Sequence, residues 1–192
     1  LMPLTNFMSE EALFGIAKCL SELKLDTEIE VISSFLNQLD EKNLRAVVLK
    51  WRELTSSEVL VSLLHRLSEH PHLIIIIASE LLTSGDESPQ GSEVIANCFA
   101  DSYFKTTKTY TADHILRDLI NNGNYIIPPN ARAVLVAIYL RITSTILGSR
   151  KFTEAKSHIA NLYKHFDLKG QLEEFFIKEG WVWEHKRYLK KF

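Results

Sequence analysis

The sequence contains little cysteine, proline or glycine, and each shortage excludes a class of protein. Its two cysteines, Cys19 and Cys98, are far apart and form neither a disulfide framework nor a spacing that binds metal or carries redox chemistry. Five prolines and seven glycines among 192 residues are too few for a collagen-like or low-complexity chain. No apolar run approaches the roughly 20 residues that a membrane-spanning helix needs. We therefore expect an intracellular protein, cytoplasmic or nuclear, that does not bind membranes.

The remaining composition is that of an ordinary globular protein. Hydrophobic residues make up 46% of the chain and charged residues 24%. A chain of this length buries roughly 70% of its unfolded surface, so it needs no metal or disulfide to stabilise its core. We expect residues 1–192 to form a single domain. The first residue is Leu1 rather than methionine, which indicates either a fragment of a larger protein or a cloning remnant before Met2; we expect a fragment.

The formal net charge of −2 conceals a difference between the two halves of the chain. Residues 1–96 contain 7 Lys or Arg and 15 Asp or Glu, whereas residues 97–192 contain 15 and 9. The halves therefore carry net charges of −8 and +6. Such a bias is typical of contact with an oppositely charged partner. It also arises when the two halves face each other or when both charged surfaces are merely solvated.

Apolar residues recur at helical spacing along most of the chain, after residues that commonly begin helices. Ser9 is the expected N-cap of the first helix, whose inner face consists of Leu13, Ile16, Ala17, Leu20 and Leu23. Later helices are predicted to begin at Thr27, Asp40, Thr55, Pro71, Ser92, Thr111, Ala131 and Thr153. This pattern predicts an all-α fold of nine to eleven helices. Because the connections are short, we expect a stack of antiparallel helical hairpins.

The run from Leu73 to Ile77 has no polar interruption. Its β-branched residues would suit a buried strand, but the apolar pattern continues to Leu82 and no partner strand is evident. We therefore predict a helix that is buried on nearly all sides.

Residues 84–91 contain two glycines, a proline and small polar residues, and they separate the acidic half from the basic half. They have nothing to bury, so we predict an exposed loop. This loop is also the possible boundary if the domain is subdivided, although eight residues are an ordinary helix–helix connection as well.

Part of the helical pattern resembles known repeat families. Residues 139–166 resemble a tetratricopeptide helix pair, with an apolar first helix, Gly148 near its end, and an aromatic-x-x-Ala sequence opening the second helix. In that family the aromatic and the small residue let the two helices pack closely, and Phe152 and Ala155 match those places. The first half is more similar to HEAT or armadillo hairpins, with helix pairs of about 30 residues. An irregular all-helical domain without repeats is the alternative.

Motifs that would indicate an enzyme are missing from the sequence. It has no glycine-rich phosphate loop, no G-x-S-x-G nucleophile turn and no H-E-x-x-H zinc helix. His65, His70 and His72 are close in sequence, but no nearby cysteine completes a zinc site. Cys19 and Cys98 occupy apolar helical positions, where cysteine is usually a small buried residue. We therefore expect no enzymatic activity, no cofactor and no bound metal.

The C-terminal residues 181–192 interleave aromatic and basic side chains. Aromatic rings beside cations suit stacking on bases and contacts with phosphates. They equally suit a final helix whose aromatic residues close the core while its lysines stay in water. The predicted binding residues, here and just before this segment, are Arg150, Lys151, Lys156, Trp181, Trp183, Lys186, Arg187, Tyr188, Lys190 and Lys191.

These features favour a non-enzymatic protein–protein interaction module or a scaffold subunit of a multiprotein complex, with proteins as its partners. The alternative is a nucleic-acid-binding helical domain that uses the basic second half, with Arg132, Arg141 and Lys164 as further contacts. The surface distinguishes the two hypotheses. A continuous basic groove favours nucleic acid, whereas an apolar or mixed-charge groove favours a peptide or protein.

Overall fold

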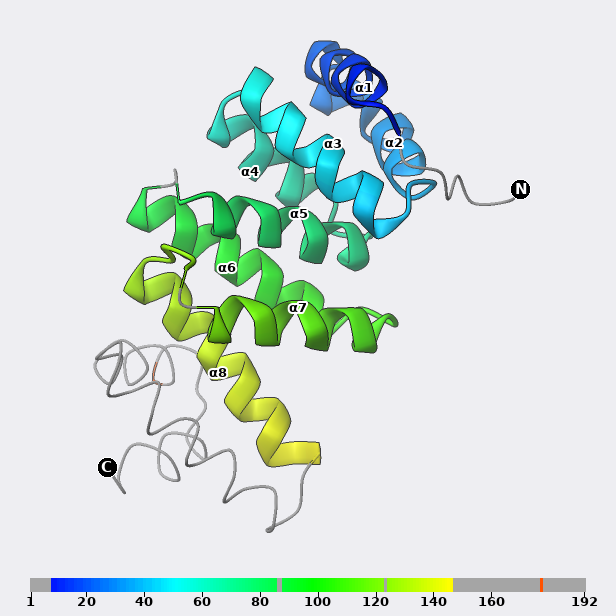
Figure 1. Cartoon of the computed structure of the whole chain (residues 1–192). Helices are drawn as coiled ribbons and strands as arrows, with labels where there is room; N and C mark the ends of the chain where they lie inside the picture. Colours follow the sequence, from blue (N-terminus) through cyan, green and yellow to red (C-terminus); the bar gives the residue numbers. More distant parts are fainter. Residues whose placement is uncertain (1–7, 86–87, 123, 147–176, 178–192) are drawn as a thin grey trace.

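The computed structural model describes residues 8–85, 88–122, 124–146 and 177, and its described part is all-α. The eight helices are α1 (Glu10–Glu22), α2 (Leu25–Leu36), α3 (Glu41–Leu54), α4 (Ser57–Arg66), α5 (Pro71–Ser84), α6 (Pro89–Tyr103), α7 (Thr109–Asn121) and α8 (Pro129–Ile146). The described residues contain no strand. The all-α prediction is therefore confirmed for this part of the chain (Figure 1).

Three predicted helix starts are confirmed. The Ser9 hydroxyl accepts a hydrogen bond from the Ala12 N–H at 3.3 Å at the start of α1. The Asp40 carboxylate accepts from the Asn43 N–H at 2.8 Å at the start of α3. Pro71 is the first residue of α5, where its missing N–H costs no helical hydrogen bond.

Four predicted helix caps are wrong by one to four residues, because a different residue occupies the cap. α2 begins at Leu25 rather than after Thr27, and the Glu28 carboxylate accepts the Lys24 N–H at 2.6 Å. α4 follows Ser56 rather than Thr55. The caps of α6 and α7 are Ser88 and Lys108 rather than Ser92 and Thr111. α8 begins at Pro129, two residues before the predicted start at Ala131.

The loop predicted at residues 84–91 is shorter than expected. α5 extends through Ser84 and is followed by Gly85 in the left-handed conformation, with φ of 73°. α6 already begins at Pro89, where the Ser88 hydroxyl accepts from the Gly91 N–H at 3.0 Å. Half of the predicted loop is therefore helical. Ser84 ends α5, and the serine cap with a proline at the first helical position places residues 89–91 in α6.

The helices pack in two rows along the chain (Figure 1). The odd-numbered helices contact one another in the order α1, α3, α5, α7, and the even-numbered helices in the order α2, α4, α6, α8. The two rows meet most closely where α5 packs on α6. In Figure 1 the pair α1 and α2 lies at one end of this arrangement and α8 at the other.

The core lies between the two rows, and α5 is its most buried helix. All residues from Leu73 to Leu82 are buried except Glu80, which is partly exposed. The prediction of a helix buried on nearly all sides is confirmed, because α5 contacts α3 and α7 in its own row and α4 and α6 in the other. Among the described residues, no helix has both the length and the apolar character needed to cross a membrane.

Candidate functional site

The ten predicted binding residues between Arg150 and Lys191 lie outside the described residues, as does most of the tetratricopeptide-like segment at residues 139–166. Lys164 lies outside them as well, and Arg141 falls within α8. These residues therefore remain sequence-based predictions.

Arg132 was predicted to contact nucleic acid, and the structure corrects this. Its side chain is buried, with only 3% of the residue exposed. The guanidinium donates to the Ile120 carbonyl oxygen at 3.3 Å and to the Tyr125 carbonyl oxygen at 3.0 Å. Arg132 thus ties the start of α8 to the end of α7 and to the α7–α8 connection. Burial lowers the pKa of its guanidinium.

The two cysteines differ from the prediction that both are buried. Cys19 is exposed on α1, whereas Cys98 on α6 is partly buried. The Cys98 sulfur lies 3.9 Å from Nδ1 of His65 on α4. Burial, together with the nearby charge of Asp101, raises the pKa of the Cys98 thiol, so this group stays protonated at neutral pH. A protonated, partly buried thiol is a poor nucleophile.

Two of the three histidines that are close in sequence contact side chains of other residue types. His70 contacts the Asn37 amide at 3.3 Å, and His65 contacts Cys98 instead. Within the described ranges, no group of three or more His, Cys, Asp or Glu side chains is arranged to hold a metal ion.

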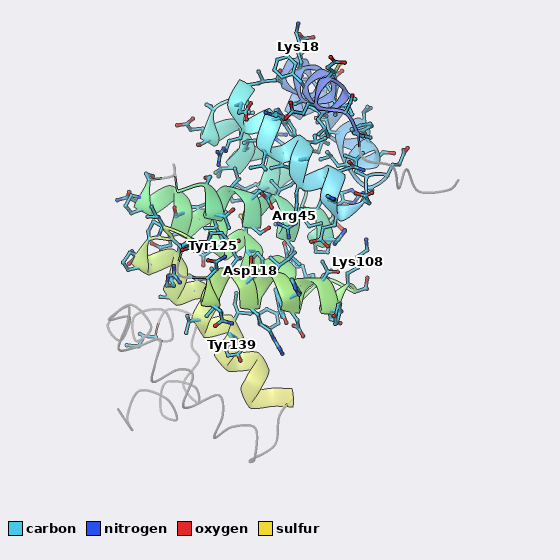
Figure 2. All side chains as sticks on the ribbon, viewed as in Figure 1. Lys18, Arg45, Lys108, Asp118, Tyr125 and Tyr139 are labelled. Carbon is cyan, nitrogen blue, oxygen red and sulfur yellow. The ribbon has the colours of Figure 1, made fainter. Side chains whose placement is uncertain are left out.

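A polar cluster on the odd-numbered row joins α3 to α5. The Arg45 guanidinium pairs with Glu80, donates to the Ser79 hydroxyl at 3.1 Å and forms an ion pair with Glu41 at 3.0 Å. In Figure 2, Arg45 lies between its own helix and α5. Burial lowers the pKa of this guanidinium, but the hydrogen bonds and charges of Glu80 and Glu41 outweigh it, so that the pKa is raised. The cluster uses its polar groups to hold two helices together.

An apolar groove between α1 and α2 is a candidate binding site in the described part of the chain. Its volume is about 480 Å³. It is lined by nine residues that are apolar apart from one thiol. Five come from α1, one is the residue that caps the C-terminus of α1, and three come from α2: Ala12, Gly15, Ile16, Cys19, Leu20, Leu23, Val31, Ile32 and Phe35.

The groove exists because α1 packs mainly along α3 and not along its neighbour in sequence. Leu20 and Ile32 are buried at the bottom of the groove. The walls above them stay accessible, and Val31 on α2 is 62% exposed. Along α1, Ala12, Ile16, Cys19 and Leu23 follow helical spacing, so they form one continuous wall.

Gly15 lies in the middle of that wall and has no side chain to fill the groove there. A glycine inside a helix costs about 1 kcal/mol relative to alanine. A Cβ atom added at Gly15 would meet no heavy atom within 4 Å. The packing of the described chain therefore does not require a glycine here, and the space beside it opens onto the groove.

The sequence contains a signal for this groove beyond the single apolar stripe expected on the first helix. The expected inner face of the first helix included Ile16 and Leu23, but these residues lie beside the groove and are only partly buried. Apolar residues that exceed one stripe, such as Val31 and Cys19, indicated a second apolar surface on these helices.

No protein-family model matches the chain, and neither does any curated protein sequence or solved structure.

Proposed function

We propose that this chain is a non-enzymatic protein-interaction module, or a scaffold subunit of a complex, that binds an apolar helical segment of a partner protein in the groove between α1 and α2. The observation that carries this proposal is the 480 Å³ apolar groove at the end of the helical arrangement. An apolar groove of this kind is the surface expected for a peptide or protein rather than for nucleic acid.

The architecture supports the same proposal. We propose that the helices form a HEAT-like stack, in which each helix packs on the second one along the chain, as α1, α3, α5 and α7 do. Stacks of helical hairpins present extended grooves and terminal helix pairs to their partners. The α1–α2 pair is such a terminal pair within the described residues.

The size and shape of the groove favour a short helix as the ligand. A cavity of about 150 Å³ accommodates a ligand the size of benzene, so this groove holds about three side chains of that size. Its α1 wall runs from Ala12 to Leu23, which corresponds to roughly 16 Å at the helical rise. Three helical turns of a ligand cover that length and place anchors at i, i+3 or i+4, and i+7. Because such an interface is small, we expect micromolar affinity.

The proposal is tested with a neutral probe peptide. The probe is a fluorescein-labelled helix of about 15 residues, with leucine at i, i+3, i+4 and i+7 and with alanine and glutamine elsewhere. Fluorescence anisotropy is measured against the full chain. We expect saturable micromolar binding that competes with the unlabelled peptide.

Three variants locate the binding. Gly15→Leu fills the groove and Val31→Glu places a charge in its wall, so each should weaken binding at least tenfold. Val94→Glu is the matched control, since Val94 is an exposed valine on α6. Circular dichroism checks that all three variants fold. Unchanged binding to Gly15→Leu and Val31→Glu, or no binding to the wild type at millimolar concentration, would refute the proposed site.

A further inference from the structure

We infer that the helix bound in this groove is basic, with Lys or Arg residues on either side of its apolar face. This inference rests on the proposed function and names the chemistry of the partner. It comes from the charges that border the groove on both helices.

On α1, a row of side chains runs along the outer edge of the groove. Glu11, Gly15, Lys18 and Glu22 are spaced by four, three and four residues, so they lie on one line of the helix. Gly15 belongs to the groove wall, which places the row directly beside it. Glu11 and Glu22 stand near its two ends, and both are exposed. Lys18, between them, projects from α1 at this end of the protein in Figure 2.

On α2, one more carboxylate lies beside the groove. Glu28 precedes the wall residue Val31 by three positions and thus shares its face of the helix. The Lys24 N–H donates to the Glu28 carboxylate at 2.6 Å, which holds this carboxylate near the start of α2. Because α1 ends where α2 begins, Glu22 and Glu28 both lie toward the same end of the groove.

The Glu22 carboxylate is not stabilised by its own helix. It is in the last turn of α1, where the helix dipole is negative and disfavours a carboxylate. Among the described residues it has no ion pair or hydrogen-bond partner. Residues 10–36 contain six acidic and two basic residues, a net charge of −4, compared with −2 for the whole chain. A cationic ligand would compensate for this concentration of negative charge.

The same charges disfavour the other occupants of an apolar groove. Two copies of this chain that met groove to groove would bring the acidic edges of both copies together. An acidic peptide would be repelled in the same way. A basic amphipathic helix instead fills the apolar groove and places its cations opposite Glu11, Glu22 and Glu28.

The test uses three probe peptides with the same leucine pattern, in which the flanking residues are all glutamine, all lysine or all glutamate. Affinity for the full chain is measured by anisotropy at 50 mM and 1 M NaCl. At low salt we expect the lysine peptide to bind about tenfold more tightly than the glutamine peptide, and the glutamate peptide about tenfold more weakly. At 1 M salt the Debye length falls to about 3 Å, so the three affinities should converge.

Charge-reversal variants assign the effect to the edge of the groove. Glu22→Lys should reduce the preference for the lysine peptide several-fold, and Lys18→Glu should increase it. Asp101→Lys is the matched control, because Asp101 is an exposed acid on α6. It should leave the preference unchanged.

Cys19 reports where the peptides bind. This exposed thiol lines the groove, so a bound peptide should slow its alkylation by iodoacetamide at least fivefold. The partly buried Cys98, whose thiol has a raised pKa, is the internal reference. Protection of Cys19 by the lysine peptide, together with the salt-dependent preference, supports the inference.

The outcomes separate this inference from the proposed function. If all three peptides protect Cys19 with equal affinity at low salt, the groove binds helices but the basic preference is wrong. If none protects Cys19, both the inference and the proposed function fail. Binding of the lysine peptide without protection of Cys19 places it elsewhere and overturns the inference. Protection that grows with protein concentration without any peptide shows that a second copy occupies the groove, which also overturns it.

Discussion

Replacing glycine by alanine should have opposite effects on stability at Gly15 and Gly85. Gly15 is inside α1, and a Cβ atom there meets nothing within 4 Å. Alanine therefore gains its higher helix propensity without a steric cost, about 1 kcal/mol of unfolding free energy. For a domain of this size, 1 kcal/mol raises the melting temperature by about 2–4 °C.

Gly85 is the matched contrast, because its φ of 73° lies in the left-handed region. Its added Cβ would be 3.7 Å from the Ile126 Cβ, which is an ordinary contact, so the cost is conformational rather than steric. Alanine in this conformation loses roughly 1–2 kcal/mol. Gly85→Ala should therefore lower the melting temperature by at least the amount that Gly15→Ala raises it.

Thermal unfolding followed by circular dichroism at 222 nm, with urea titration as a second measurement, gives both free energies. Gly15→Leu should also be at least as stable as the wild type although it blocks the groove. A lower melting temperature for Gly15→Ala would refute it, because that result would mean that the space beside Gly15 is occupied in the folded chain. An unchanged melting temperature for Gly85→Ala would refute the conformational part.

Three further predictions follow from burial and charge. Ile76→Asp should lower the unfolding free energy by several kcal/mol, about 3–5, because Ile76 is fully buried and the new carboxylate has no partner; an unchanged urea midpoint would contradict the burial of α5. Burial and the nearby charge of Lys108 lower the pKa of His72 from its ordinary value of 6.5, so the unfolded chain takes up a proton more readily than the folded one. Stability should therefore be complete above about pH 7 and decline as the pH falls through 6.5, and the decline should be smaller in His72→Gln; equal pH profiles for the two proteins would refute the assignment. Gel-shift titration with single- and double-stranded oligonucleotides should show no submicromolar, salt-sensitive binding at physiological ionic strength. If such binding is observed, and if charge reversal at Lys186, Arg187, Lys190 and Lys191 abolishes it, the nucleic-acid hypothesis replaces the protein-binding one.

The local sequence determined where a helix begins when only one nearby residue was suited to start it. Ser9, Asp40 and Pro71 each start a helix as predicted, because a cap or an N-terminal proline acts within one helical turn. Where two residues suited to the N-cap lay close together, their capping propensities did not show which of them starts the helix. Ser88 starts α6 in place of Ser92 because Pro89 is suited to the first helical position.

The burial of α5 was also predictable from the sequence, since a helix that is apolar on nearly every side has no wide face to expose to water. Amphipathic helices are different. Helical periodicity shows which residues of α1 share a face, but whether another helix covers that face depends on the path of the chain. α1 packs along α3 and leaves Cys19 exposed beside α2, and Arg132 is drawn into the α7–α8 connection by two carbonyl oxygens. The sequence thus determined the helices and the centre of the core, while tertiary packing alone decided that the first two helices diverge into a groove.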